Sequence, residues 1–507
     1  MWNHFPITFD NNDDQAMWCI SAGIFTTEPS SYLVLSHVFL GKIISLFSAQ
    51  IPEINSYTLF LEIVLLLCFF GIFYLTTIPK GISIYKEAAF ALLFVLGFLA
   101  LLVTKIQFTS VALICVGTAL LGLQSNFKYW HKLLFCLFFI VIAFLIRRES
   151  FYILLAFAFP ILILQQKKHR KWTIAILLLS TSSFLLCWWM NDNNPIYQQQ
   201  NTYSKVNIID MLAAHPIEPQ KEKLQNNNFS LDDLTLIQSW FIADNHYIDS
   251  AADYTMAKQL RTHRSISQTI LELIKCIRGE YYSILFFIIS ACTAWIFNPQ
   301  KRWFIGLNAV LLVFLFSFLA ATSRLPFRVT FPIFTYLNLV HLWSILESDR
   351  QHLLKRIAIL TLCLMAVFKF YSTIHHFSTK KEKIQLFEKY VQEINQHPNY
   401  LFIALDDFPI QYMDAWTPSK NFLQHKNVIL NGWYAATPNY AEVLKTQGLN
   451  NLTSDLLHKK SVVFLTQNEQ LLQHYRRVMQ QRYGIACHFE KVTKGFAIIQ
   501  PNLLVFD

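Results

Sequence analysis

Long apolar runs separated by short polar turns dominate the chain. A membrane-spanning helix needs about 20 mostly apolar residues, and runs near that length recur along most of the sequence. Ten candidate spans follow from this pattern: 57–78, 87–104, 107–124, 132–146, 150–166, 172–190, 281–298, 303–321, 329–346 and 354–374. The pattern predicts a polytopic α-helical membrane protein with about 10 spans.

One apolar stretch before the first span differs from the others. Residues 31–48 are apolar but include His37 and Lys42, and the pairs Glu28-Pro29 and Pro52-Glu53 flank them. This composition favours an amphipathic helix that lies on the membrane surface. A further span is the alternative interpretation.

The tail has a different pattern from the rest of the chain. Short apolar runs, typical of strands, alternate with longer polar stretches that are typical of helices. The strand-like runs are 400–405, 428–430, 462–466 and 497–500, and the helix-like stretches are 380–396, 439–447 and 468–481. Residues 375–507 are therefore predicted to form a small α/β domain.

Composition and charge narrow the class further. The chain has 507 residues, of which 54% are hydrophobic and 15% charged, against about 25% charged in ordinary soluble proteins. The net charge is +10, and the basic excess lies within the hydrophobic part. This distribution argues against nucleic-acid binding, which requires a basic soluble face.

The basic loops predict an orientation, because cytoplasmic loops are enriched in Lys and Arg. The richer set of short loops contains Lys80, Lys86, Lys128, Lys132, Lys167, Lys168, Arg170, Lys171, Lys301, Arg302, Arg350, Lys355 and Arg356. Placing this set in the cytoplasm leaves residues 1–56, 191–281 and 375–507 on the outside. The bundle is then divided into two halves, 57–190 and 282–374.

An acidic cluster, Asp10-Asn11-Asn12-Asp13-Asp14, precedes the surface helix. Such carboxylates suit general-base work on a sugar hydroxyl, or the binding of a divalent cation such as Mg²⁺ or Mn²⁺. The alternative is a solvated loop that caps a helix, since Asp is favoured at caps. Asp13 and Asp14 are the candidate catalytic and metal-binding residues.

Two arginine clusters break the charge rule on the outer side. Ionisable groups at membrane depth indicate a functional site by default, and arginine can grip a phosphate with two hydrogen bonds. The clusters contain Arg147, Arg148 and Glu149, and Arg324 and Arg328 on either side of Pro326. They are predicted to bind a donor phosphate, with snorkelling anchors as the alternative.

The large outer loop contains Trp240-Phe241-Ile242-Ala243-Asp244. Aromatic side chains bind the faces of sugars, so Trp240 and Asp244 are candidates for contact with an acceptor. A tryptophan that packs its loop onto the membrane is the commoner alternative.

These pieces together resemble a known superfamily. An outer acidic motif, a surface helix near a proline, a multi-span bundle and an outer soluble domain resemble the GT-C membrane glycosyltransferases. An uncharacterised bacterial group of GT-C-like proteins is similar in its short motifs, which match here at Asn12-Asp13-Asp14, Gly23-x-x-Thr26-x-x-Pro29, Gln107-Phe108-Thr109-Ser110, Ile146-Arg147-Arg148-Glu149-Ser150, Trp240-x-x-Ala243-Asp244 and Arg324-Leu325-Pro326-x-Arg328.

The resemblance implies a catalytic acid at Asp13 or Asp14 and a donor built on polyprenyl phosphate or pyrophosphate. It implies a bacterial cytoplasmic membrane and a further span before the acidic motif, which only about ten residues precede here. The expected function is transfer of a sugar from this donor to an envelope glycan or lipid on the outer face. A glycan polymerase or ligase, and a transporter or flippase of lipid-linked glycans, are the alternatives.

Overall fold

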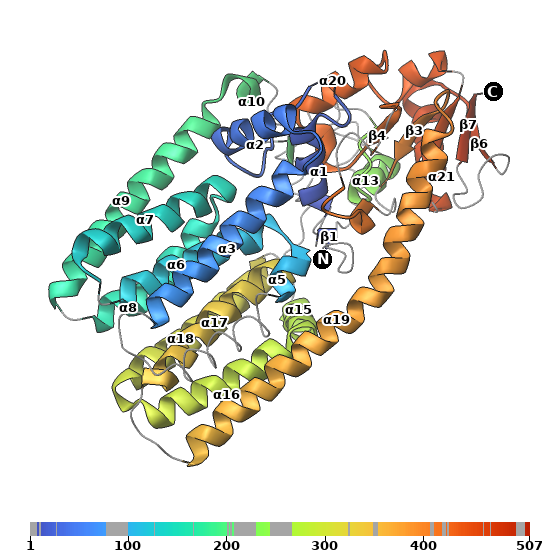
Figure 1. Cartoon of the computed structure of the whole chain (residues 1–507). Coiled ribbons are helices and arrows are strands. Elements are labelled where there is room, and N and C mark those ends of the chain that lie inside the picture. Colours follow the sequence, from blue (N-terminus) through green and yellow to red (C-terminus); the bar gives the residue numbers. More distant parts are fainter. Residues whose placement is uncertain are drawn as a thin grey trace.

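The computed structural model describes residues 8–9, 12–26, 28–77, 100–125, 127–165, 167–199, 202, 205–206, 230–243, 266–322, 325–347, 353–405, 410–417, 422, 425–459, 461–466, 468–492 and 502–506. Within them, a helical bundle occupies one end of the molecule and a small α/β domain the other (Figure 1).

The bundle helices coincide with nine of the ten candidate spans. They are α3 (Ser56–Thr77), α6 (Phe108–Gln124), α7 (Tyr129–Ile146), α8 (Ser150–Leu164), α9 (Lys167–Asp192), α16 (Tyr281–Phe297), α17 (Arg302–Thr322), α18 (Phe327–Glu347) and α19 (Leu353–Asn395). Of candidate 87–104, only its end, mostly in α5 (Ala100–Thr104), lies within the described residues.

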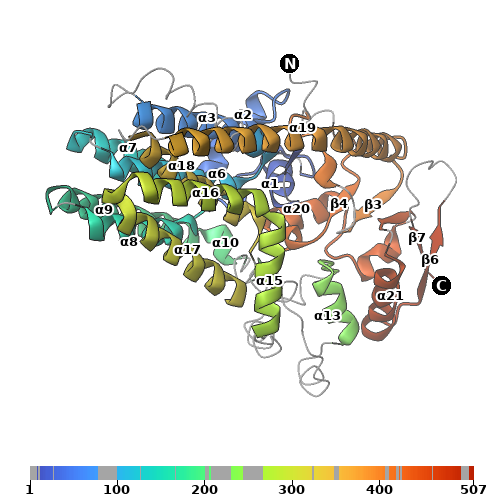
Figure 2. The same cartoon turned by 90° about the horizontal axis from the view of Figure 1, so that it is seen from below.

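The predicted number of spans is not confirmed. Among the described residues, four helical segments are long and apolar enough to cross a membrane: Ser56–Leu75, Tyr129–Ile146, His169–Asp192 and Pro299–Ala321. A fifth arises if α15 (Ile266–Gly279) and α16 count as one span, although an 81° bend separates them. Figure 2 shows α15 turned away from the axis of α16. With at least four such segments, the protein is a multi-pass membrane protein.

The predicted surface helix begins later than expected. Helix α2 spans Val38–Gln50, and residues 31–37 before it are not helical. Val34 has a positive φ of 64°, which interrupts any helix, and the His37 side chain accepts a hydrogen bond from the Phe39 N–H as the N-cap. Gly41 allows the helix to approach Ser31 closely, because a Cβ there would lie 2.1 Å from the Ser31 carbonyl oxygen.

The C-terminal domain confirms the predicted small sheet. Strands β3 (Leu401–Ala404), β4 (Val428–Leu430) and β5 (Val462–Leu465) pair in parallel, and β7 (Asn502–Phe506) and β6 (Cys487–Lys491) extend the sheet antiparallel in the order β4-β3-β5-β7-β6. Helices α20 (Pro438–Thr446) and α21 (Glu469–Tyr483) match two predicted helices. Candidate strand 497–500 lies outside the described residues. Neither β6 nor β7 was predicted, and in β6 only Cys487 is buried.

A short helix that the hydropathy pattern did not predict connects the two parts of the molecule. Helix α1 (Asn12–Ala22) lies between the bundle and the domain (Figure 1). On the domain side, the Gln15 amide donates to the Ile410 carbonyl at 3.0 Å. On the bundle side, β1 (Thr8–Phe9) pairs with β2 (Lys105–Ile106) just before α6. Asp13 and Asp14 are thereby held at the domain end of the bundle.

Candidate functional site

The first turn of α6 organises the site. Gln107 caps the helix, with its side-chain oxygen accepting from the Ser110 N–H at 2.8 Å. The next three residues each contact a different site residue: the Phe108 N–H donates to Asp14, the Thr109 hydroxyl accepts from Arg147, and the Ser110 hydroxyl donates to the Arg328 carbonyl. One tetrapeptide thus connects segments that are far apart in the sequence.

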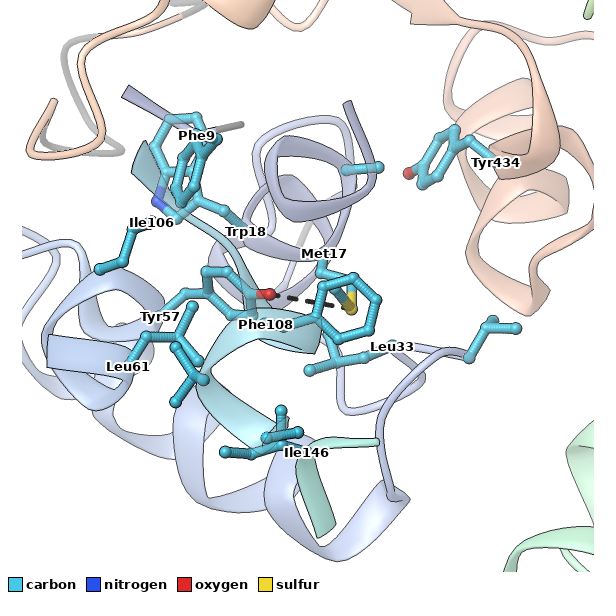
Figure 3. Close-up of a cluster of buried hydrophobic side chains, with 14 of the residues drawn as sticks. Phe9, Met17, Trp18, Leu33, Tyr57, Leu61, Ile106, Phe108, Ile146 and Tyr434 are labelled. Atoms are coloured by element: carbon cyan, nitrogen blue, oxygen red, sulfur yellow. Dashed lines mark hydrogen bonds between the residues drawn. The ribbon is translucent and has the colours of Figure 1, made fainter. Parts of the chain in front are cut away.

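Asp14 lies inside the protein. Its side chain is fully buried, and Oδ1 accepts from the Tyr57 hydroxyl at 2.8 Å and the Phe108 N–H at 3.0 Å. Tyr57 and Phe108 sit with Phe9, Met17 and Trp18 in one packed cluster (Figure 3). Burial raises the pKa of Asp14 well above its ordinary value, against the lowering effect of both hydrogen bonds. These are the contacts of an acid that fixes the structure.

Asp13 faces the other way and pairs with an arginine 315 residues distant. Arg328 Nη1 lies 3.0 Å from Asp13 Oδ2, and each side chain keeps 16% of its surface exposed. Arg328 stands in the first turn of α18, which begins at Phe327 directly after Pro326. The structure therefore brings one predicted acid and one predicted phosphate ligand together at a partly open position.

The side chains of Arg147 and Arg148 contact different parts of the protein. Arg147 donates to Thr109 Oγ1 at 3.1 Å, and its guanidinium lies 5.0 Å from the centre of the Phe108 ring, so it joins the α6 turn. Arg148 instead pairs with Asp192 at the end of α9, at 3.0 Å. Glu149 contacts both, Arg147 at 3.3 Å and Arg148 at 3.4 Å. The predicted joint grip of both arginines on one phosphate does not follow from this geometry.

Sequence reasoning missed a second polar group beside Arg328. Glu280, between α15 and α16, is 3% exposed and accepts from the Thr330 hydroxyl at 2.8 Å. Lys105 and Lys369 lie close enough for their charges to act on this carboxylate, and Lys105 Nζ lies 5.3 Å from the Phe327 ring centre. Lys105 thus adds positive charge near the first turn of α18, where Arg328 lies. The only signal for Glu280 in the sequence was its position as an ionisable residue next to an apolar run.

Trp240 docks on the C-terminal domain. The Ile242 N–H donates to Asn431 Oδ1 at 2.8 Å, and the Asn431 amide donates back to the Ile242 carbonyl at 3.0 Å. Trp240 itself has a φ of 57° and lies next to Gly432. This segment therefore packs on the sheet after β4. Arg324 and Asp244, the other two candidates, lie outside the described residues.

The described residues offer a poor donor set for a divalent cation. Metal binding favours several carboxylate or imidazole ligands around one point, and no group of three His, Cys, Asp or Glu side chains meets this condition in the part of the chain that is described. Asp13 is already paired with a guanidinium, and Asp14 points into the interior.

Comparison with known proteins gives information on the fold only. No family model and no curated protein sequence matches the chain. The crystal structure of ArnT from Cupriavidus metallidurans in the apo state is similar, with a TM-score of 0.50, 10% identity, and coverage of 99% of this chain and 94% of that one. The same enzyme bound to undecaprenyl phosphate gives 0.49 at 10% identity, over 98% and 94%. The chain therefore shares its overall fold with ArnT.

Proposed function

We propose that the protein is an integral membrane glycosyltransferase that moves a sugar from a polyprenyl-phosphate-linked donor to an envelope glycan or lipid on the extracytoplasmic face. The ArnT-like fold is consistent with the predicted GT-C transferase, and one of the ArnT structures is bound to undecaprenyl phosphate. The orientation is supported by the charge of the short loops. The observation that carries the proposal is the partly exposed Asp13–Arg328 pair at the first turn of α6, which Arg147 also contacts.

In the proposed reaction, Asp13 and Arg328 have different roles. The acceptor oxygen attacks the anomeric carbon, and its proton passes to the Asp13 carboxylate as general base. The bond between that carbon and the phosphate oxygen breaks, and the phosphate leaves with the electron pair. Arg328 then meets the developing negative charge, which fixed cations stabilise most strongly in a site shielded from water.

The ion pair gives the site a resting state. While no donor is bound, Arg328 neutralises Asp13 at 3.0 Å. Arrival of a phosphate competes for the guanidinium, which frees the carboxylate for the acceptor hydroxyl. Asp14 holds the start of α6 in place behind this pair through the Phe108 N–H and Tyr57.

The test is release of polyprenyl phosphate from a polyprenyl-phosphate hexose by the purified protein in proteoliposomes. Asp13→Asn keeps the shape of the side chain but removes the base, so we expect the rate to fall by about 100- to 10,000-fold. Asp232→Asn is the matched control, because Asp232 also pairs with an arginine, Arg477, but on the far side of the domain. A wild-type rate in Asp13→Asn would remove the assignment and favour the polymerase or ligase.

A further inference from the structure

A recess opens beside Arg148, away from the Asp13–Arg328 pair. It lies between the start of α2, the turn from α7 to α8, and the end of α9, and is open to the surface. The lining side chains that matter here are His37, Phe144, Arg148, Glu149, Asn191 and Val206. Its walls are tied together, since the Val38 N–H donates to Asn191 Oδ1 at 3.1 Å and the His37 N–H to the Leu145 carbonyl at 2.9 Å.

The charge balance of this recess does not suit an anion. The Arg148 guanidinium faces two carboxylates, Asp192 at 3.0 Å and Glu149 at 3.4 Å. Burial lowers the pKa of His37, outweighing its hydrogen bond with the Cys187 carbonyl, so its imidazole is neutral. A phosphate entering here would meet the Glu149 carboxylate and a guanidinium whose charge two carboxylates already neutralise.

The same groups suit hydroxyls. A hydroxyl both donates and accepts, so it can pair at once with a carboxylate and with a guanidinium or carboxamide N–H. Glu149, Arg148 and Asn191 offer this mixture at the recess. Such mixed lining of an apolar hollow is typical of a small-molecule site.

The surroundings indicate that the ligand carries an apolar tail. Large apolar side chains point outward on both flanking helices, with Phe39 on α2 53% exposed and Leu186 and Trp189 on α9 57% and 64% exposed. Helix α9 contains one of the segments apolar enough to span the membrane. A headgroup in the recess would therefore leave its chain along lipid-facing surface.

We propose that this recess binds the uncharged, hydroxyl-rich headgroup of a membrane glycolipid, which is the acceptor of the transfer. The acceptor role rests on the proposed function, whereas headgroup binding does not. Glu149 connects the recess to the Asp13–Arg328 region, because one of its oxygens contacts Arg148 and the other Arg147.

The experiment measures retained lipid by native mass spectrometry in a detergent without a sugar headgroup. The probes are monoglucosyl diacylglycerol and a phosphatidic acid with the same acyl chains. Val206→Trp fills the recess and Asn191→Leu removes its carboxamide, and in both we expect retention of the glycolipid to fall about tenfold. Val310→Trp is the matched control, since Val310 is 66% exposed on α17, and it should leave retention unchanged.

Each outcome decides the matter. Wild-type retention of the glycolipid in Val206→Trp with an unchanged melting temperature overturns the proposal, as does a selective loss of phosphatidic acid. If glycolipid binding depends on Val206 but Arg328→Ala has normal transfer, the headgroup site stands and the proposed function fails. If transfer occurs and Val206→Trp leaves the acceptor KM unchanged, only the acceptor role is lost.

Discussion

The region around Asp13 and the recess beside Arg148 share one side chain, Glu149, but their charge balance differs. In the region of Asp13 and Glu280, four cations, Arg328, Arg147, Lys105 and Lys369, lie with these two carboxylates and one oxygen of Glu149. In the recess, one guanidinium is matched by two carboxylates. The first region suits a phosphate and the second an uncharged headgroup, as a transferase with a charged donor and a glycolipid acceptor would require.

Backbone geometry explains how two neighbouring arginines serve two regions. Helix α7 ends at Ile146 and α8 begins at Ser150, and Arg147 between them has extended angles, with φ −152° and ψ 110°. In an extended backbone, successive side chains point to opposite sides. Arg147 therefore turns to Phe108 and Arg148 to Asp192. Adjacency in the sequence is no evidence for a shared ligand here.

Among the arginines, the largest effect is expected at Arg328. Arg328→Ala removes the cation that meets the leaving phosphate, so kcat should fall by about 100- to 1,000-fold, measured as polyprenyl phosphate release. Arg477→Ala is the control, because this arginine pairs with Asp232 between α21 and α13 (Leu231–Gln238) and lies 47% exposed. Retention of glycolipid should be normal in both variants. A similar loss of rate in both would mean that ion pairs matter here only for folding.

The adjacent arginines give the sharpest contrast. Arg147→Ala should lower turnover of the donor about 100-fold by removing a cation near the phosphate, with little effect on the acceptor KM. Arg148→Ala should raise the acceptor KM about tenfold and leave kcat nearly unchanged, because binding energy is lost equally in the ground and transition states. Steady-state kinetics with donor and acceptor varied in turn separate the two. Identical kinetic effects would show that the two regions are one site.

Much of the bundle could be predicted from hydropathy, whereas the pairings of the site could not. Apolar runs located α3 and α9 within a few residues, because lipid exposure imposes the pattern. The start of α2 was missed, since the positive φ of Val34 leaves no hydropathy signal. Asp13 and Arg328 were both candidates, but their contact depends on the chain path between them. Glu280 was overlooked because its partner Thr330 is 50 residues away.

The smallest effect on activity is expected at Asp14, which borders Asp13 in the sequence but belongs to neither region. Asp14→Asn keeps an oxygen for the Tyr57 hydroxyl and the Phe108 N–H, so donor turnover should stay within about threefold of wild type, unlike that of Asp13→Asn.

The pH dependence of stability distinguishes the two acids. Because burial raises the pKa of Asp14 in the folded protein, folding favours its neutral form. This contribution is complete at pH values below its unfolded pKa and is lost as the pH rises through the folded pKa. The melting temperature of the wild type, followed by intrinsic tryptophan fluorescence, should therefore decline with rising pH. The carboxamide in Asp14→Asn stays neutral at every pH, so this variant should lose less stability over the same range. Parallel melting curves, or a large loss of turnover in Asp14→Asn, would place Asp14 with Asp13 in the reaction rather than behind it.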